Sequence, residues 1–157
     1  MGNKNTTLFQ NLNDLPATLS SAQYVPHKHE LLICGSVTNR SCYSYHTLKN
    51  EYKFICEYPS HVQLVGYCVV KLADNKDSNQ ITLLSFGGDK NLRHTLVMKY
   101  VSIWSNISNK SNELNNYNQW IPFTDNHNHP IIIGKDQHSY YHGMRAVIGG
   151  KIIICYL

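Results

Sequence analysis

The sequence has few charged residues, and its basic residues do not cluster. Lys, Arg, Asp and Glu make up 15% of the 157 residues, and the formal net charge is only +4. Proteins that bind nucleic acids usually gather Lys and Arg into a patch or a run. We therefore expect no nucleic-acid partner. The many Asn residues between the apolar runs are typical of solvated loops.

Cysteine pairs at the spacing of a metal or redox motif are also missing. The chain has five Cys, and no two of them form a C-x-x-C pair. An odd number of Cys argues against a disulfide framework, and a free Cys within an apolar run behaves as a small hydrophobic residue. We therefore expect reduced thiols and a cytoplasmic location. The five are Cys34, Cys42, Cys56, Cys68 and Cys155.

We find no secretory signal in the sequence and no apolar run long enough to cross a bilayer. The start, MGNKNT, matches the pattern for N-myristoylation of Gly2, although so short a pattern also arises by chance. A single acyl chain binds membranes only marginally, and no basic cluster lies nearby to strengthen it. We expect at most weak membrane association, and the mass of the purified N-terminal peptide would reveal the acyl group.

Signals for helices are nearly absent, because no long segment repeats apolar residues at helical spacing between capping residues. Short runs rich in β-branched and aromatic residues alternate instead with Asn, Gly, Ser, Asp and Pro. The sequence therefore predicts a flexible segment at residues 1–20 and an all-β domain at residues 21–157. The expected strands are AQYVPH, ELLICG, SCYSYHT, EYKFICEY, GYCVVKL, ITLLSFGG, HTLVMKYVSIW, QWIPFT, MRAVIGG and KIIICYL.

Two groups of four expected strands repeat the same order of features. They cover residues 21–60 and 66–125, and a third group, residues 144–157, contains only two strands. In each complete group the second strand closes on Gly, the third carries Tyr, and the fourth opens on an aromatic residue. The residues of this repeat are Gly35, Tyr45 and Tyr52, then Gly87, Gly88, Tyr100 and Trp120, then Gly149 and Gly150.

This repeat resembles that of the kelch family of β-propellers, in which an apolar strand closes on a Gly pair and a Tyr and a Trp follow. The segment YHTLKNEY reproduces the spacing, with Tyr52 in place of Trp, while Ser36 replaces the second Gly of the first group. An Asn-rich loop separates Tyr100 from Trp120 in the second group. The resemblance covers residues 21–157 and implies an incomplete kelch-type β-propeller of four-stranded antiparallel blades.

Two blades and half of a third are too few to close a propeller, which has roughly 4–8 blades. An open stack exposes a blade face and unpaired strand edges. We therefore expect a fragment of a longer propeller, or a chain that must associate. In the alternative interpretation the fold is a sandwich, and Gly87-Gly88 marks a hairpin or a bulge. A non-functional truncated copy of a longer gene is a further alternative.

Histidine is the residue type most suggestive of chemistry, and two pairs have i, i+2 spacing: His27 with His29, and His127 with His129. Such a pair on a strand could share zinc with a carboxylate such as Asp125. Without a third ligand at a defined spacing, however, the pattern favours polar loop residues, so we assign no metal, cofactor or catalytic residue. A galactose-oxidase-like or metal-binding remnant of a propeller enzyme is the alternative function that the resemblance implies.

The resemblance and the expected loops together favour a non-catalytic scaffold for protein–protein interaction. Loops held on a rigid frame make binding surfaces, and long loops are expected at residues 73–80, 106–118 and 125–143. The last is rich in His and Tyr. Its candidate residues for binding a protein partner are His138, Tyr140, Tyr141 and His142.

Replacing His138, Tyr140, Tyr141 and His142 together with Ala is expected to abolish capture of the partner without unfolding the domain. The measurement is affinity capture with mass spectrometry on the wild-type chain and the variant, with circular dichroism as the control for folding. Unchanged capture would show that the partner binds elsewhere.

Overall fold

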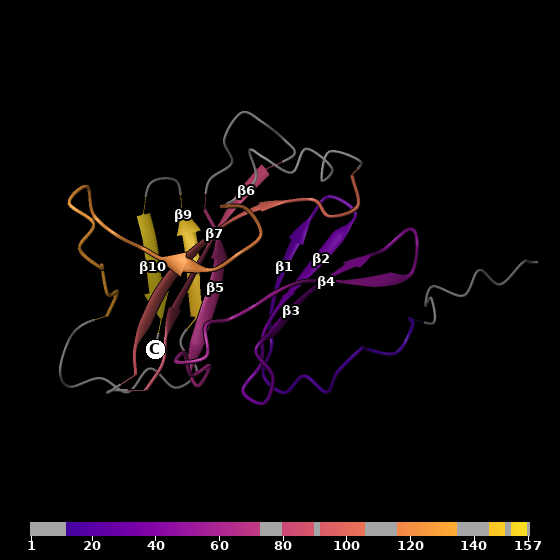
Figure 1. The fold of residues 1–157 in the computed structure, drawn as a ribbon, viewed down its shortest axis with the longest axis horizontal. Coiled ribbons are helices and arrows are strands. Elements are labelled where there is room, and N and C mark those ends of the chain that lie inside the picture. The colour runs from indigo at the N-terminus through magenta and orange to yellow at the C-terminus, as the bar shows by residue number, and fades with distance from the viewer. Residues whose placement is uncertain are drawn as a thin grey trace, which may run out of the picture.

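The chain folds into antiparallel β-structure (Figure 1). The computed structural model describes residues 12–72, 80–89, 92–105, 116–134, 145–149 and 152–156. The N-terminal sheet contains β1 (Gln23–His27), β2 (Glu30–Cys34), β3 (Ser41–His46) and β4 (Glu51–Glu57). The central sheet contains β5 (Tyr67–Lys71), β6 (Gln80–Gly87), β7 (His94–Val101) and β8 (Ile121–Pro122). The C-terminal hairpin contains β9 (Arg145–Gly149) and β10 (Ile152–Tyr156).

Both four-stranded sheets are meanders, in which each strand pairs with the next one along the chain. The expectation of an all-β chain with two groups of four antiparallel strands is confirmed, and the described residues contain no helix and no closed sheet. The arrangement into propeller blades stays a prediction. Within the described part of the chain there is accordingly no helix long and apolar enough to cross a membrane.

The three units follow one another across the molecule, with the central sheet between the other two (Figure 1). The first strands of the units are neighbours, because β1 contacts β5 and β5 contacts β9. Burial agrees with this order. Adjacent residues of β6, Leu83 and Leu84, point to opposite faces and are both buried, whereas Tyr24 and Pro26 of β1 are exposed. The central sheet is therefore covered on both faces.

The main core lies between the N-terminal and central sheets. Each sheet contributes alternate residues to it, for example Val25 and Leu32 from one sheet and Val69 and Met98 from the other. A second, smaller cluster occupies the opposite face of the central sheet. Its members are Cys68, Val70, Leu84 and Phe86, against which Leu72, Phe123 and Ile133 pack.

Three cysteines form a row across the core-facing side of the N-terminal sheet. Cys34 lies opposite Cys42, and Cys42 lies opposite Cys56. All three are free thiols, as is Cys68. A hydrogen bond with Cys42 and burial raise the pKa of Cys34, and the same two causes raise that of Cys56. These two thiols are therefore neutral packing groups, as the apolar sequence around them predicts.

Gly35 and Gly87 follow or close the second strand of each sheet because the chain turns there with positive φ, at 62° and 126°. A Cβ on Gly87 would lie 2.6 Å from the carbonyl oxygen of Gly66, which belongs to the segment entering β5 of the same sheet. A Cβ on Gly35 would meet the Leu64 side chain at 2.5 Å, in the segment that joins the two sheets. Glycine is therefore required at both positions by the positive φ of the turn and by the close approach of the segment that joins the two sheets.

Buried hydrogen bonds also join the elements. The Tyr67 hydroxyl donates to the carbonyl oxygen of Cys34 at 2.6 Å, and the Tyr58 hydroxyl donates to Ser85 Oγ at 3.0 Å. Ser85 Oγ also lies 3.0 Å from Nε2 of His94. His94 is only 5% exposed, and burial is the main reason that its pKa falls to about 4, with nearby His61 as a second cause.

The free energy of unfolding is expected to fall as the pH drops from about 6.5 to about 4. Between these values the unfolded chain binds a proton at His94 that the folded chain does not bind, so acid favours unfolding. The loss from this residue is on the order of 3 kcal/mol and is complete below the folded pKa. Urea unfolding across this pH range should show a shallower dependence for His94→Asn than for the wild type. The exposed-residue control, His29→Asn, should follow the wild type, and equal slopes in all three proteins would contradict the assignment.

Candidate functional site

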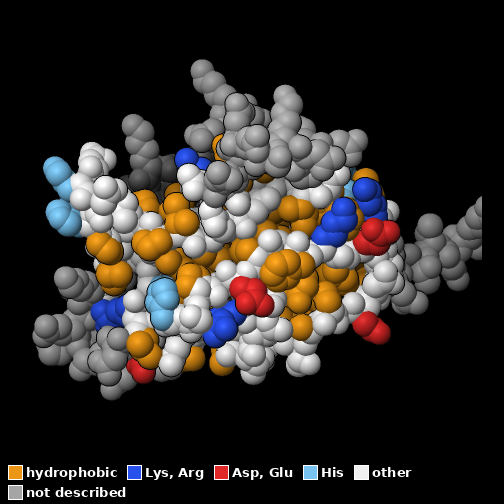
Figure 2. All heavy atoms as spheres, viewed as in Figure 1, with side chains coloured by type: hydrophobic (Ala, Val, Ile, Leu, Met, Phe, Trp, Pro, Cys, Tyr) orange, Lys and Arg blue, Asp and Glu red, His pale blue; other side chains and the backbone are white. Residues whose placement is uncertain are grey.

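The most distinctive exposed surface is the face of the N-terminal sheet that points away from the central sheet, which we call the outer face. Because strand residues alternate between faces, the residues next to the core-facing ones point outward. Hydrophobic side chains are visible across the N-terminal and central sheets in the space-filling view (Figure 2). The outer face consists of Tyr24, Pro26, Leu31, Ile33, Tyr43, Tyr45, Tyr52 and Phe54. Tyr24, Pro26 and Phe54 are exposed, whereas Ile33 and Tyr45 are buried beneath their neighbours.

Two aromatic pairs cross from β3 to β4 on the outer face. The rings of Tyr45 and Tyr52 lie 4.8 Å apart in a tilted arrangement, and those of Tyr43 and Phe54 lie 5.9 Å apart, edge to face. The Tyr45 hydroxyl donates to Oδ1 of Asn50 at 2.9 Å, which fixes the first pair. Partial burial, followed by the neighbouring Tyr45, raises the pKa of Tyr52. The phenol of Tyr52 is therefore neutral at physiological pH, and this surface is apolar.

A groove of about 570 Å³ runs between the outer face and the segment before β1. Leu12 and Leu15 of this segment form one wall, and Tyr24, with 51% of its surface exposed, contributes to the other. Charged groups are restricted to a few positions such as Lys28. On the β4 side of the face Phe54 is 54% exposed. Tyr24 and Phe54 are therefore presented to solvent at the two edges of this face, and exposed aromatic side chains are typical of a docking site.

The outer face has a counterpart in the central sheet. The two sheets can be compared strand by strand because β2 and β6 both end at a glycine of positive φ, Gly35 and Gly87. With these glycines aligned, Leu31 of the outer face corresponds to Leu83. Leu83 is completely buried in the core shared with the N-terminal sheet. The outer face thus corresponds to the face of the central sheet that another sheet covers.

The same comparison pairs Tyr52 with Trp120. Tyr52 lies opposite Tyr45 of β3. Trp120 lies opposite Met98 of β7 when the register of β8 is extended by one residue. Tyr45 and Met98 occupy equivalent positions, because their partners in β2 and β6 are equivalent. Tyr52 and Trp120 are therefore the same position of two similar sheets.

Trp120 shows how an aromatic residue at this position packs when the face of its sheet is covered by another sheet. Its ring stacks on Tyr58 at 4.7 Å with an angle of 19° between the planes. Its Nε1 donates to Sγ of Cys42 in the N-terminal sheet at 3.4 Å, and the residue is only 5% exposed. Tyr52 is only partly buried and lines the groove that Leu12, Leu15 and Tyr24 also line.

Tyr100 lies on the covered face of the central sheet, two residues beyond the position equivalent to Tyr45. Its hydroxyl donates to Glu30 of the N-terminal sheet, which also accepts a 2.7 Å hydrogen bond from Ser44. Burial, followed by the contact with Glu30, raises the pKa of Tyr100. Trp104 Nε1 donates to Ser44 Oγ at 2.9 Å and completes this network. The buried carboxylate therefore has hydrogen-bond donors and fastens the two sheets together.

The remaining repeat residues are dispersed. Gly88 continues the turn after β6 with φ of 108°, and a Cβ there would lie 2.5 Å from the carbonyl oxygen of Leu92. Gly149 ends β9 opposite Ile152. Six predicted positions lie outside the described residues and stay predictions. They are Gly2 for lipidation, Gly150 for the repeat, and His138, Tyr140, Tyr141 and His142 for the partner-binding loop.

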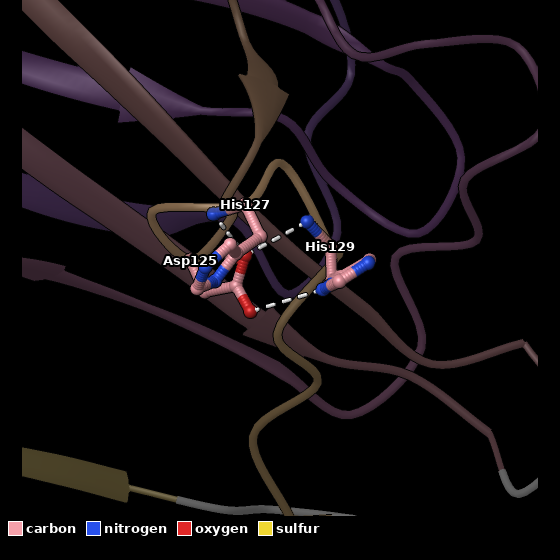
Figure 3. A group of neighbouring side chains, drawn as sticks. All are labelled: Asp125, His127 and His129. Carbon is pink, nitrogen blue, oxygen red and sulfur yellow. Dashed lines mark hydrogen bonds and ion pairs between the residues drawn. The ribbon is translucent and has the colours of Figure 1, made fainter.

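The structure separates one histidine pair and brings the other together. His27 ends β1 and is buried, whereas His29 lies in the turn before β2, because Lys28 has φ of 54°. His127 and His129 lie at the tip of a loop with Asp125, and their potential ligand atoms are all within 4.8 Å of one another (Figure 3). The signal for this cluster was an Asp two residues before a His-x-His pair.

No family model, no curated protein and no solved structure matches the chain. The functional interpretation therefore depends on the geometry of the outer face and of the exposed loops of this chain.

Proposed function

We propose that the chain is a non-catalytic protein-interaction module, built of stacked kelch-like sheets, that docks a protein partner through its outer face. The observation that carries the proposal is the correspondence between the outer face and the covered face of the central sheet. Equivalent faces of the two sheets therefore differ in their surroundings, because the face of the central sheet is covered by another sheet and the outer face is partly exposed.

The chemistry of the outer face supports this role. Interface centres are enriched in aromatic residues, and truncating one of them often weakens binding strongly. The outer face offers Tyr24, Tyr52 and Phe54 at its surface, on strands whose backbone is already ordered. Docking on such a preformed surface costs little conformational entropy.

The same correspondence indicates the chemistry of the partner. The covered face of the central sheet packs against Val25, Leu32 and Cys42, which form a flat face of small and aliphatic side chains. A partner for the outer face is therefore a protein that presents a similar apolar sheet face. An aromatic residue such as Tyr52 would insert into that face as Trp120 inserts against Cys42.

An enzymatic function has weaker support. Ser85 and His94 form a hydrogen bond like that of a nucleophile and its base, but they are 0% and 5% exposed. Ser85 Oγ also accepts a hydrogen bond from the Tyr58 hydroxyl, beneath the stacked ring of Trp120. Within the part of the chain that the structure describes, both residues are buried, and the geometry favours a role in packing.

Phe54→Lys is expected to lower the amount of captured partner at least about tenfold, because a charged group would be buried in an apolar interface. The matched control is Leu48→Lys, which changes an equally hydrophobic and 72% exposed residue in the turn between β3 and β4. The measurement is quantitative mass spectrometry after capture from the native cell extract.

A photo-reactive amino acid at position 54 or 24 should then crosslink to the same captured protein, and one at position 48 should not. Equal loss for Phe54→Lys and Leu48→Lys, or crosslinks only from position 48, would contradict docking on the outer face. Loss of capture only in the loop variant of His138 and its neighbours would assign the partner to the loop instead.

A further inference from the structure

The loop after β8 is closed by hydrogen bonds within its own backbone. Thr124 and Pro130 form an antiparallel bridge at its base. The N–H of Asp125 donates to the carbonyl oxygen of His129 at 2.9 Å, and the N–H of Asn128 donates to the carbonyl oxygen of Asp125 at 3.1 Å. Asn128 makes the turn with φ of 63°, a conformation that Asn tolerates well. The tip is thus a rigid frame for the side chains that it carries.

The carboxylate of Asp125 is fixed at the centre of this tip. Its Oδ1 accepts hydrogen bonds from the backbone N–H groups of His127 at 2.8 Å and His129 at 2.9 Å (Figure 3). These bonds, the one from His129 first, lower the pKa of Asp125. Its second oxygen, Oδ2, lies 3.2 Å from Nδ1 of His129.

The two imidazole rings lie on the same side of the loop as that oxygen. They are stacked with centroids 6.0 Å apart and an angle of 27° between their planes. One ligand atom from each of Asp125, His127 and His129 falls within 4.8 Å of the others. In a tetrahedral zinc site with bonds of about 2.0–2.1 Å, neighbouring ligand atoms are about 3.3 Å apart. The contact between Asp125 and His129 already has this length, and a rotation of the exposed His127 ring would have to close the remaining distance.

We propose that Asp125, His127 and His129 form a binding site for a zinc ion at the tip of this loop. The ion would be held by Oδ2 of Asp125 and one ring nitrogen of each histidine, with water at the fourth position. Two imidazoles and one carboxylate are a ligand set that zinc accepts, and three protein ligands with one open position form a recurrent zinc arrangement. The loop lies at the end of the molecule away from the N-terminal sheet, so the site is independent of the outer face (Figure 1).

A simple ion pair is the competing explanation for the contact between Asp125 and His129. A protonated His129, whose side chain is 77% exposed, could be attracted to the carboxylate without any metal. The two explanations differ in what they require of His127. Zinc needs its ring as a ligand, whereas the ion pair uses only its backbone N–H, which replacement of the side chain leaves in place.

The test is isothermal titration of tag-free, reduced protein with zinc chloride at neutral pH. One zinc per chain is expected. His127→Ala, His129→Ala and Asp125→Asn should each weaken zinc binding by at least about tenfold. This is the smallest effect expected even for residues that only orient metal ligands, so loss of a ligand itself should be no smaller. Asp125→Asn keeps an Oδ1 acceptor for the two backbone N–H groups, so the loop remains folded. The matched controls, Asn126→Ala in the same loop and His29→Ala at another exposed histidine, should bind as the wild type does.

Substitution of cobalt for zinc separates this site from the cysteine row. Histidine and carboxylate ligands give weak visible bands, whereas thiolate ligands add an intense near-ultraviolet charge-transfer band that should be absent. Failure of the wild type to bind zinc, full affinity in His127→Ala, or a thiolate band would each overturn the proposal. Unaltered zinc affinity in Phe54→Lys is expected, because the outer face is a separate surface.

Discussion

The insertion of Trp120 between the N-terminal and central sheets is the contact on which the rest of the structure depends. Its ring covers Tyr58 in the segment that joins the sheets, and its N–H reaches the cysteine row through Cys42. The largest buried cluster extends around it. Because an aromatic ring buries a large apolar area in a defined orientation, this contact fixes which face of the central sheet meets the other sheet. The hydrogen bond from Tyr100 to Glu30 joins the same two sheets and requires a defined orientation between them.

The stacking is of the head-to-tail type, because equivalent faces of the two sheets point in the same direction. Leu83 of the central sheet faces the N-terminal sheet, and the equivalent Leu31 faces away from it. In a two-fold contact the same face of both units is buried, whereas a head-to-tail contact buries different faces and leaves one face open at each end of the stack. The outer face of the N-terminal sheet is therefore the open face of this stack, and Tyr52 occupies the position that Trp120 has in the central sheet. The docking proposal follows from the equivalence between the outer face and the covered face of the central sheet. The proposed zinc site depends only on the loop after β8.

Much of the fold was accessible from the sequence, because period-two patterns and turn residues act locally. The glycines that close β2 and β6 marked the ends of those strands, and Tyr52 and Trp120 marked the fourth strands. The sequence could not show that Tyr100 lies two residues from the position of Tyr45, since the alignment of β3 with β7 depends on pairing with other strands. It also could not show which sheet face is left uncovered, because that is a property of the packing.

The two histidine pairs also show that spacing in the sequence does not determine whether two side chains lie together. Both have identical spacing, yet the left-handed turn at Lys28 separates His27 from His29, whereas the loop around Asn128 gathers His127, His129 and Asp125. Spacing alone does not determine the direction of a side chain unless the backbone conformation is known.

The central claim, that the Trp120 face of the central sheet packs against the N-terminal sheet, is tested most directly by NMR. The account predicts nuclear Overhauser effects from the indole protons of Trp120 to side-chain protons of both Tyr58 and Cys42. It also predicts slow exchange of the indole N–H with water, because that residue is only 5% exposed. Absence of both effects, with rapid exchange of the Trp120 indole N–H in the folded protein, would contradict the account.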